Sequence, residues 1–179
     1  MTFDRKALTY RIAQQGDWAE LSRLVNTVYR TKVSDKQWTT EATLVGGTRL
    51  IEKEFLVNIA DPHCRILLLE LADQLLGCVR LLLDPDSKCH LGMLSIHETS
   101  QNTGLGRILI NYAEEFAKKS LGASAMILHV IAQRPELIEW YVRLGYKDTG
   151  LFEKFDESPE DDVVHLQAGL YFKILSKAL

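Results

Sequence analysis

A glycine-rich segment at residues 101–106, Gln-Asn-Thr-Gly-Leu-Gly, has residue types and spacing suited to binding a phosphate. A long helical pattern follows it. The first N–H groups of a helix lack intrahelical partners, and the helix dipole adds partial positive charge at that end. Gly104 and Gly106 let a phosphate approach the backbone because they have no Cβ, and Arg107 adds charge. The segment therefore predicts an anion site at a helix N-terminus.

The same glycine spacing has other interpretations. Gly-x-Gly before a helix is also typical of a tight loop with close helix packing. A Rossmann dinucleotide site needs a third glycine where this chain has Leu109, and a P-loop needs Gly-Lys followed by Ser or Thr. The spacing argues against these two nucleotide sites, but it does not by itself separate phosphate binding from packing.

Two stretches in the correct order resemble the GNAT acetyltransferase superfamily. Residues 94–106 match its pattern of a strand, a short loop and Gln/Arg-x-x-Gly-x-Gly/Ala at the start of a helix, with Glu98 where a proline is frequent. Residues 128–146 resemble its next strand and helix, which close on Trp140-Tyr141 and Gly145-Tyr146. The resemblance is firm over residues 94–146, and the order of the surrounding elements extends it over nearly the whole chain.

The resemblance implies acetyl-CoA as the acyl donor and gives its binding residues. The glycine segment would hold the pyrophosphate, and the main chain of the preceding strand would pair with the pantetheine amides. Arg134 stands where the family often has an Asn that contacts the cofactor, so this particular contact departs from the family pattern. The predicted cofactor residues are Leu94, Ser95, Ile96, Gln101, Asn102, Thr103, Gly104, Leu105, Gly106, Arg107 and Arg134.

Acetyl transfer needs a neutral amine, a polarised thioester carbonyl and a proton for the departing thiolate. Tyr141 matches the family tyrosine that protonates the thiolate, and its alternative role is packing on a helix. His90 lies where several members carry a basic Glu, so it is a candidate general base or a half-buried strand histidine. His129 and Glu98 are weaker candidates. His129 shares the strand face of Ile127 and Ile131, so it is expected on the other side of the sheet from Leu128 and Val130.

The acceptor is predicted to bind near residues 38–49, in a region that resembles a Trp-Thr-x-Glu … Gly-x-Arg stretch of the family. The candidate residues are Trp38, with Glu41 for an amine and Arg49 for a carboxylate. Helix capping and a surface ion pair are the alternative roles of the charged side chains.

Hydrophobic periodicity predicts a mixed sheet with helices, in the α+β class. Short turns at 73–74 and 84–87 imply an antiparallel meander, Gly46-Gly47 should end any preceding helix, and Asp17 is a candidate N-cap. The predicted strands are 10–13, 65–71, 75–83, 90–97, 125–131, 146–149 and 166–175; the predicted helices run from Trp18 to Val28 and over 49–59, 105–121 and 135–144.

Bulk properties limit the class of protein. A chain of 179 residues with 46% hydrophobic residues suits one domain, 1–179, and a net charge of -3 disfavours nonspecific nucleic-acid binding. The odd cysteine count excludes a complete disulfide framework, and no Cys or His spacing predicts a metal. The N-terminus lacks the apolar region of a signal peptide and no segment predicts a membrane span, so a cytoplasmic protein is expected.

These features predict an N-acetyltransferase that moves an acetyl group from acetyl-CoA to a primary amine of a small molecule or peptide. A noncatalytic acyl-CoA-binding or regulatory module of the same fold is the alternative, and transfer of a longer acyl group is a third interpretation. The family resemblance also makes a homodimer an expectation, whereas the identity of the amine stays open.

Overall fold

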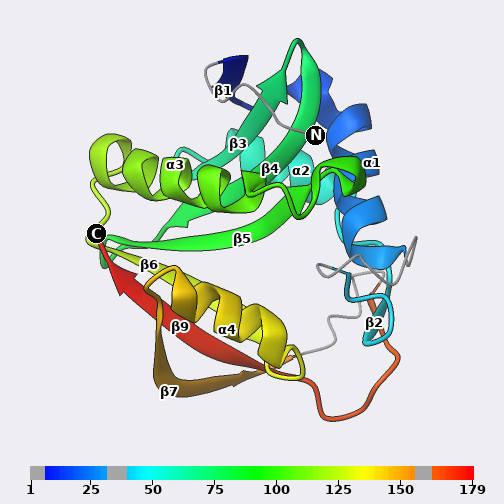
Figure 1. Cartoon of the computed structure of the whole chain (residues 1–179), viewed down its shortest axis with the longest axis vertical. Coiled ribbons are helices and arrows are strands. Elements are labelled where there is room, and N and C mark those ends of the chain that lie inside the picture. Colours follow the sequence, from blue (N-terminus) through cyan, green and yellow to red (C-terminus); the bar gives the residue numbers. More distant parts are fainter. Residues whose placement is uncertain (1–6, 32–39, 156–162) are drawn as a thin grey trace.

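A computed structural model describes residues 7–31, 40–155 and 163–179. Its centre is a seven-stranded mixed sheet in the order β1-β3-β4-β5-β6-β9-β7, in which only β5 and β6 pair in parallel (Figure 1). The strands are β1 Leu8–Ile12, β3 Cys64–Leu71, β4 Gln74–Leu83, β5 Lys88–Ile96, β6 Ala125–Ile131, β7 Lys147–Lys154 and β9 Tyr171–Ala178. The predicted α+β class and meander are confirmed.

Helices cover both faces of the sheet and leave two separate cores. On one face, α3 (Leu105–Ser120) and α4 (Pro135–Arg143) pack through Leu109, Ala113 and Tyr141. On the other face, α1 (Trp18–Arg30) and α2 (Glu52–Ala60) form a core around Leu21 and Phe55. These two sides are called the α3 face and the α1 face below.

Strands β5 and β6 separate along their length. They pair from Lys88 opposite Ala125 as far as Leu91 opposite Leu128, and no ladder continues beyond that point. The β4–β5 register shifts between Cys78 and Arg80, and opposite this shift Met93 has a left-handed φ of 56°. Such a bulge bends a strand and strengthens its twist. The two strands therefore diverge toward their C-terminal ends.

Several element bounds differ from the prediction. The second helix begins at Glu52 rather than Arg49, and Gly46-Gly47 belongs to a short strand, β2 (Val45–Gly47), paired with β8 (Val163–His165). The last strand begins at Tyr171, not residue 166, and β7 extends through Lys154. Asp17 stands at the N-cap of α1 without capping it, because its carboxylate accepts from Gln14 N–H and from Arg11. The glycine pair and the polar runs therefore predicted where the chain leaves its helices, but not which conformation it adopts there.

In the described part of the chain, no helix is long and apolar enough to span a membrane. Among the same residues, no three His, Cys, Asp or Glu side chains gather as metal ligands. Cys64, Cys78 and Cys89 are buried free thiols.

Candidate active site

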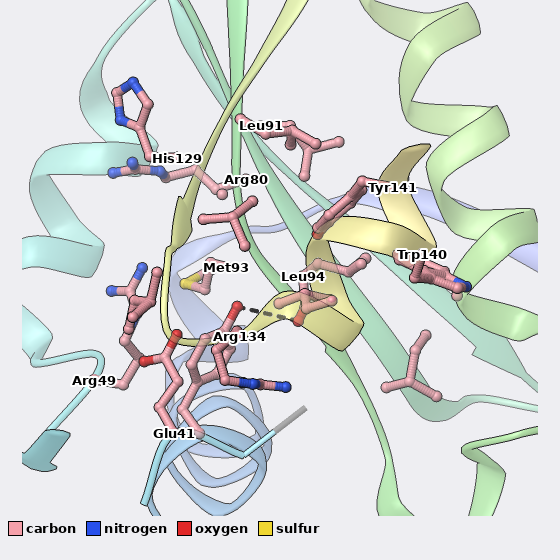
Figure 2. A pocket seen from close by; sticks show the side chains of 18 of the residues that line it. Glu41, Arg49, Arg80, Leu91, Met93, Leu94, His129, Arg134, Trp140 and Tyr141 are labelled. Carbon is pink, nitrogen blue, oxygen red and sulfur yellow. Dashed lines mark hydrogen bonds between the residues drawn. The ribbon is translucent and has the colours of Figure 1, made fainter. Parts of the chain in front are cut away.

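A cavity of about 1100 Å³ occupies the gap between β5 and β6. Gly104, Gly106 and Trp140 line it on the α3 face, whereas Arg49, Arg80 and His129 line it on the α1 face. Figure 2 shows Arg49, Arg80 and His129 on one side of the cavity, with Tyr141 and Trp140 across it. One ligand can therefore enter from each face and meet the other between the strands.

The glycine segment forms the N-terminus of α3, as predicted. Gly104 is the N-cap residue with φ 87°, a left-handed conformation that a side chain would strain, and no atom lies within 4 Å of where its Cβ would be. Asn102 also has positive φ, 61°, and the Gln101 side-chain amide donates to the Ile96 carbonyl at 3.0 Å. These contacts join the loop to the end of β5 and leave space above the helix start.

A Cβ on Gly106 would lie 3.5 Å from the Trp140 ring, which is an ordinary contact. Packing within the protein therefore does not itself require glycine at this position. A Cβ would fit here, but it would fill the space between the helix start, the indole and Ile96.

Most of the predicted cofactor residues line the cavity: Leu94, Ile96, Gln101, Asn102, Gly104, Gly106, Arg107 and Arg134. Three do not. Ser95 is fully buried with its hydroxyl donating to the Met93 carbonyl, Leu105 is buried in the core, and the Thr103 hydroxyl donates to the Ser100 carbonyl. Thr103 stabilises the loop, while Ser95 and Leu105 can reach a ligand only through their main chain.

Tyr141 lies in the wall of the cavity on α4, with 5% of its surface exposed. Its hydroxyl makes no hydrogen bond to another described residue, while its ring packs edge-on against Trp140 and Tyr146. Burial, with a further contribution from Tyr29, raises the pKa of Tyr141 well above its ordinary value. The phenol therefore stays protonated and available as a proton donor.

Arg134 is buried, and its Nη1 donates to the Thr40 carbonyl at 3.0 Å. Its Nε pairs with Glu136. The side chain thus joins the start of α4 to the segment after α1, and it lines the cavity.

The two candidate histidines lie on the α1 face with ring centroids 5.5 Å apart. His90 sits where β5 still pairs with β6, and its Nε2 is 3.1 Å from Asp84 Oδ2. His129 is one residue beyond that pairing. Burial, together with the nearby charges of His90 and Arg80, lowers the pKa of His129, although Glu153 at 3.8 Å opposes the shift. His129 is therefore neutral at neutral pH, and it lines the cavity with its ring between His90 and Phe172.

The predicted acceptor residues have different surroundings. Glu41 lines the cavity but is already paired with Arg30 at 2.9 Å, and both side chains are largely buried. The Arg49 guanidinium lies over the Tyr29 ring, 5.3 Å from its centroid. Trp38 falls within residues 32–39, outside the described residues.

Several lining residues were absent from the predicted site, and Tyr29 and Arg80 are the two considered next. The Tyr29 hydroxyl donates to the Leu94 carbonyl at 3.2 Å, and burial raises its pKa. Nothing in the pattern of its amphipathic helix separates it from a packing tyrosine. Arg80 had a usable signal, since it is the only charged residue of an otherwise apolar strand.

The separating parallel strands, the glycine-capped helix start and the buried Tyr141 all border this one cavity. The model of the acetyltransferase (GNAT) family matches residues 20–146. The chain belongs to this family, and it is an N-acetyltransferase of the type that transfers acetyl from acetyl-CoA to an amine. The prediction of family, fold and activity is confirmed.

Solved structures of a spermidine N-acetyltransferase from Vibrio cholerae have the same fold. The complex with CoA and spermine is 20% identical, covers 97% of this chain and 96% of that one, and has a TM-score of 0.68. A form with manganese ions is 19% identical, covers 97% of this chain and 93% of that one, and has a TM-score of 0.67. A dodecameric form is 19% identical, covers 97% of this chain and 95% of that one, and has a TM-score of 0.68. No curated protein matches the chain. At these identities the likeness to the solved structures concerns the fold alone.

Proposed function

We propose that this protein acetylates a primary amine by direct attack of the amine on bound acetyl-CoA, with both substrates present together. One observation carries the proposal: the cavity between β5 and β6 is bordered by a glycine-capped helix start on one face and by Arg49, Arg80 and His129 on the other. The part of the cavity beside these three side chains is called the chamber below. This arrangement supports a reaction without a covalent enzyme intermediate, because the amine can reach the thioester from the face opposite the cofactor.

The α3 face is the proposed cofactor side. The pyrophosphate would accept from the first N–H groups of α3 beside Gly104 and Gly106, with Arg107 adding charge. The pantetheine arm would run between the strands along residues 94–96. A hydrogen bond from the main chain there would polarise the thioester carbonyl.

Tyr141 is the proposed acid. The amine nitrogen bonds to the thioester carbon, the carbon–sulfur bond breaks, and the phenol proton passes to the departing thiolate. The burial that raises the pKa of Tyr141 would also raise the pKa of the CoA thiol beside it, since each group is uncharged when protonated. Proton transfer between them therefore stays feasible in the closed site.

The base that takes the amine proton is proposed to be a histidine of the α1 face. His90 was predicted from the sequence, but its ring is held by Asp84 at the closed end of the gap. His129 lies where the strands have separated, and partial burial lowers its pKa. These two observations favour His129 as the proton acceptor, with His90 packed against its ring.

A thiol-release assay with acetyl-CoA and a panel of primary amines tests the activity. Tyr141→Phe should lower kcat by about 100-fold with CoA affinity unchanged, because the substitution removes the proton-donating hydroxyl and keeps the ring. Tight CoA binding without thiol release for any amine would instead support the noncatalytic acyl-CoA-binding module.

We also propose that residues 1–179 form one domain and that this domain self-associates. Every residue of the edge strand β7 is exposed, and exposed apolar side chains stand on this strand, Leu151 and Phe152, and on the paired strand β9, Tyr171. Light scattering should show an oligomer that Phe152→Glu weakens. A monomer at all concentrations would contradict this assembly.

A further inference from the structure

Arg80 is an unusual residue for the middle of an apolar strand. It is the only charged residue of β4, and its side chain lies on the α1 face. Its Nη1 makes two long contacts, at 3.5 Å with Asn58 Oδ1 and at 3.9 Å with Glu54 Oε1. Its Nε is buried and has no partner among the described residues. A guanidinium has five N–H donors, so most of this donor capacity is unused by the described protein groups.

The opposite strand leaves room for this guanidinium. Gly92 of β5 pairs with Arg80, and a Cβ at Gly92 would lie 3.5 Å from Nη2 and 3.8 Å from Nε. Any longer side chain would crowd the guanidinium. Both residues line the cavity, so glycine at position 92 leaves the guanidinium accessible to a ligand.

Arg49 is a second arginine in the same chamber. Asn26 Oδ1 fixes its backbone by accepting from the Arg49 N–H at 2.7 Å, and the Tyr29 ring supports its guanidinium at 5.3 Å. Within the described residues, the guanidinium has no carboxylate at ion-pair distance. Figure 2 shows Arg49 on the same side of the cavity as Arg80, across from Tyr141.

The acidic residues of the chamber do not balance these two arginines. Glu41 is already paired with the buried Arg30, and Glu54, which is 38% exposed, is 3.9 Å from Arg80. Among the described residues that line this side of the cavity, Arg30, Arg49 and Arg80 outnumber the carboxylates Glu41 and Glu54. Asp84 and Glu153 lie beside the two histidines and do not line the cavity. Such a chamber attracts an anionic group and repels a polycation.

We infer that the acceptor is an amine that also carries a carboxylate or phosphate group, which Arg49 and Arg80 bind while the amine faces the thioester. This inference rests on the proposed acetyl transfer and specifies its substrate class. It also separates this chain from an enzyme for polyamines, whose acceptors are polycations.

The test uses pairs of amines that differ in the anionic group. Phenylalanine is compared with phenethylamine, and O-phosphoethanolamine with ethanolamine, with spermidine as the polycation; thiol release gives kcat/KM. In at least one pair the anionic member should be at least about tenfold better, equivalent to one 1.4 kcal/mol interaction. The pair that shows the preference distinguishes carboxylate from phosphate.

Variants connect this preference to the two arginines. Arg80→Gln and Arg49→Gln should each bring the ratio within a pair close to one, Arg80→Lys should retain part of it, and CoA affinity should not change. Arg23→Gln is the matched control, because Arg23 is exposed on α1 and outside the cavity. Testing Arg49 independently keeps the experiment decisive if an Arg80 variant folds poorly.

Three outcomes would overturn the inference. A preference for spermidine or for the neutral amines refutes it while leaving acetyl transfer intact. If both Gln variants leave the kcat/KM ratio within each pair unchanged, these arginines do not bind the acceptor. The same follows if the variants lose CoA affinity as strongly as they lose the preference for the anionic amine. If the protein binds CoA but releases thiol with no amine, the proposed function itself is wrong, and this inference with it.

Discussion

The two faces of the β5–β6 gap are built in different ways. On the α3 face, one continuous segment from the end of β5 through Gly104 and Gly106 forms the helix start, and the donors are backbone N–H groups. On the α1 face, the chamber is assembled from α1, the segment before α2, β4, β5 and β6, and its charged groups are side chains of residues distant in sequence. The first face can hold a constant cofactor, whereas the second can vary with the acceptor through single substitutions.

The largest effect is expected from Gly104→Glu on the α3 face. The substitution strains a left-handed residue and places a carboxylate where the pyrophosphate would bind. Loss of two charge-assisted hydrogen bonds, at about 2 kcal/mol each, would weaken CoA binding by about 1,000-fold. Calorimetric titration measures the CoA dissociation constant. Gly16→Glu is the control, because Gly16 is exposed and has open space around it. Unchanged affinity would refute the pyrophosphate site.

A smaller effect is expected from His129→Gln on the α1 face. Removing the proposed proton acceptor should lower kcat by about 100-fold and leave CoA affinity unchanged, since the cofactor lies on the other face. His90→Gln should cost much less because His90 is at the closed end of the gap. The reverse order of the two variants would restore His90, the residue predicted from the sequence, as the base.

The contrast between the faces also explains how far the sequence could predict the site. The α3 face depends on local backbone geometry, so a contiguous pattern from Gln101 to Arg107 was sufficient to predict a helix start, and most of these residues line the cavity. The acceptor side depends on residues distant in sequence. Glu41 and Arg49 were found only through a family-like stretch, and the partner of Glu41, Arg30, was not found. Tyr29 and Arg80 reach the chamber only because α1 and β4 pack beside the bulge at Met93.

The ion pair of Arg30 and Glu41 provides a test of the acceptor side alone. Arg30→Met leaves a buried carboxylate without its partner and should cost about 3 kcal/mol of unfolding free energy. Denaturant titration measures this loss, and the double variant with Glu41→Met should recover most of it, because no charge is then left unpaired. Arg30→Met should also free Glu41 and improve the relative rate with spermidine. No change in that relative rate would mean that the carboxylate does not face the acceptor.

The smallest effect concerns the pH dependence of the reaction. A base must be deprotonated to act, so kcat should fall as the pH drops through the pKa of His129 in the enzyme–substrate complex. Burial and the charges of His90 and Arg80 lower that pKa, which places the acid limb below the ordinary histidine value of about 6.5. Arg80→Gln removes one positive neighbour, so the pKa should rise and the limb should move toward higher pH. Stopped-flow measurement of kcat against pH for the parent and the variant tests this expectation. If the acid limb of the kcat profile stays fixed or moves toward lower pH, another group on this face accepts the proton.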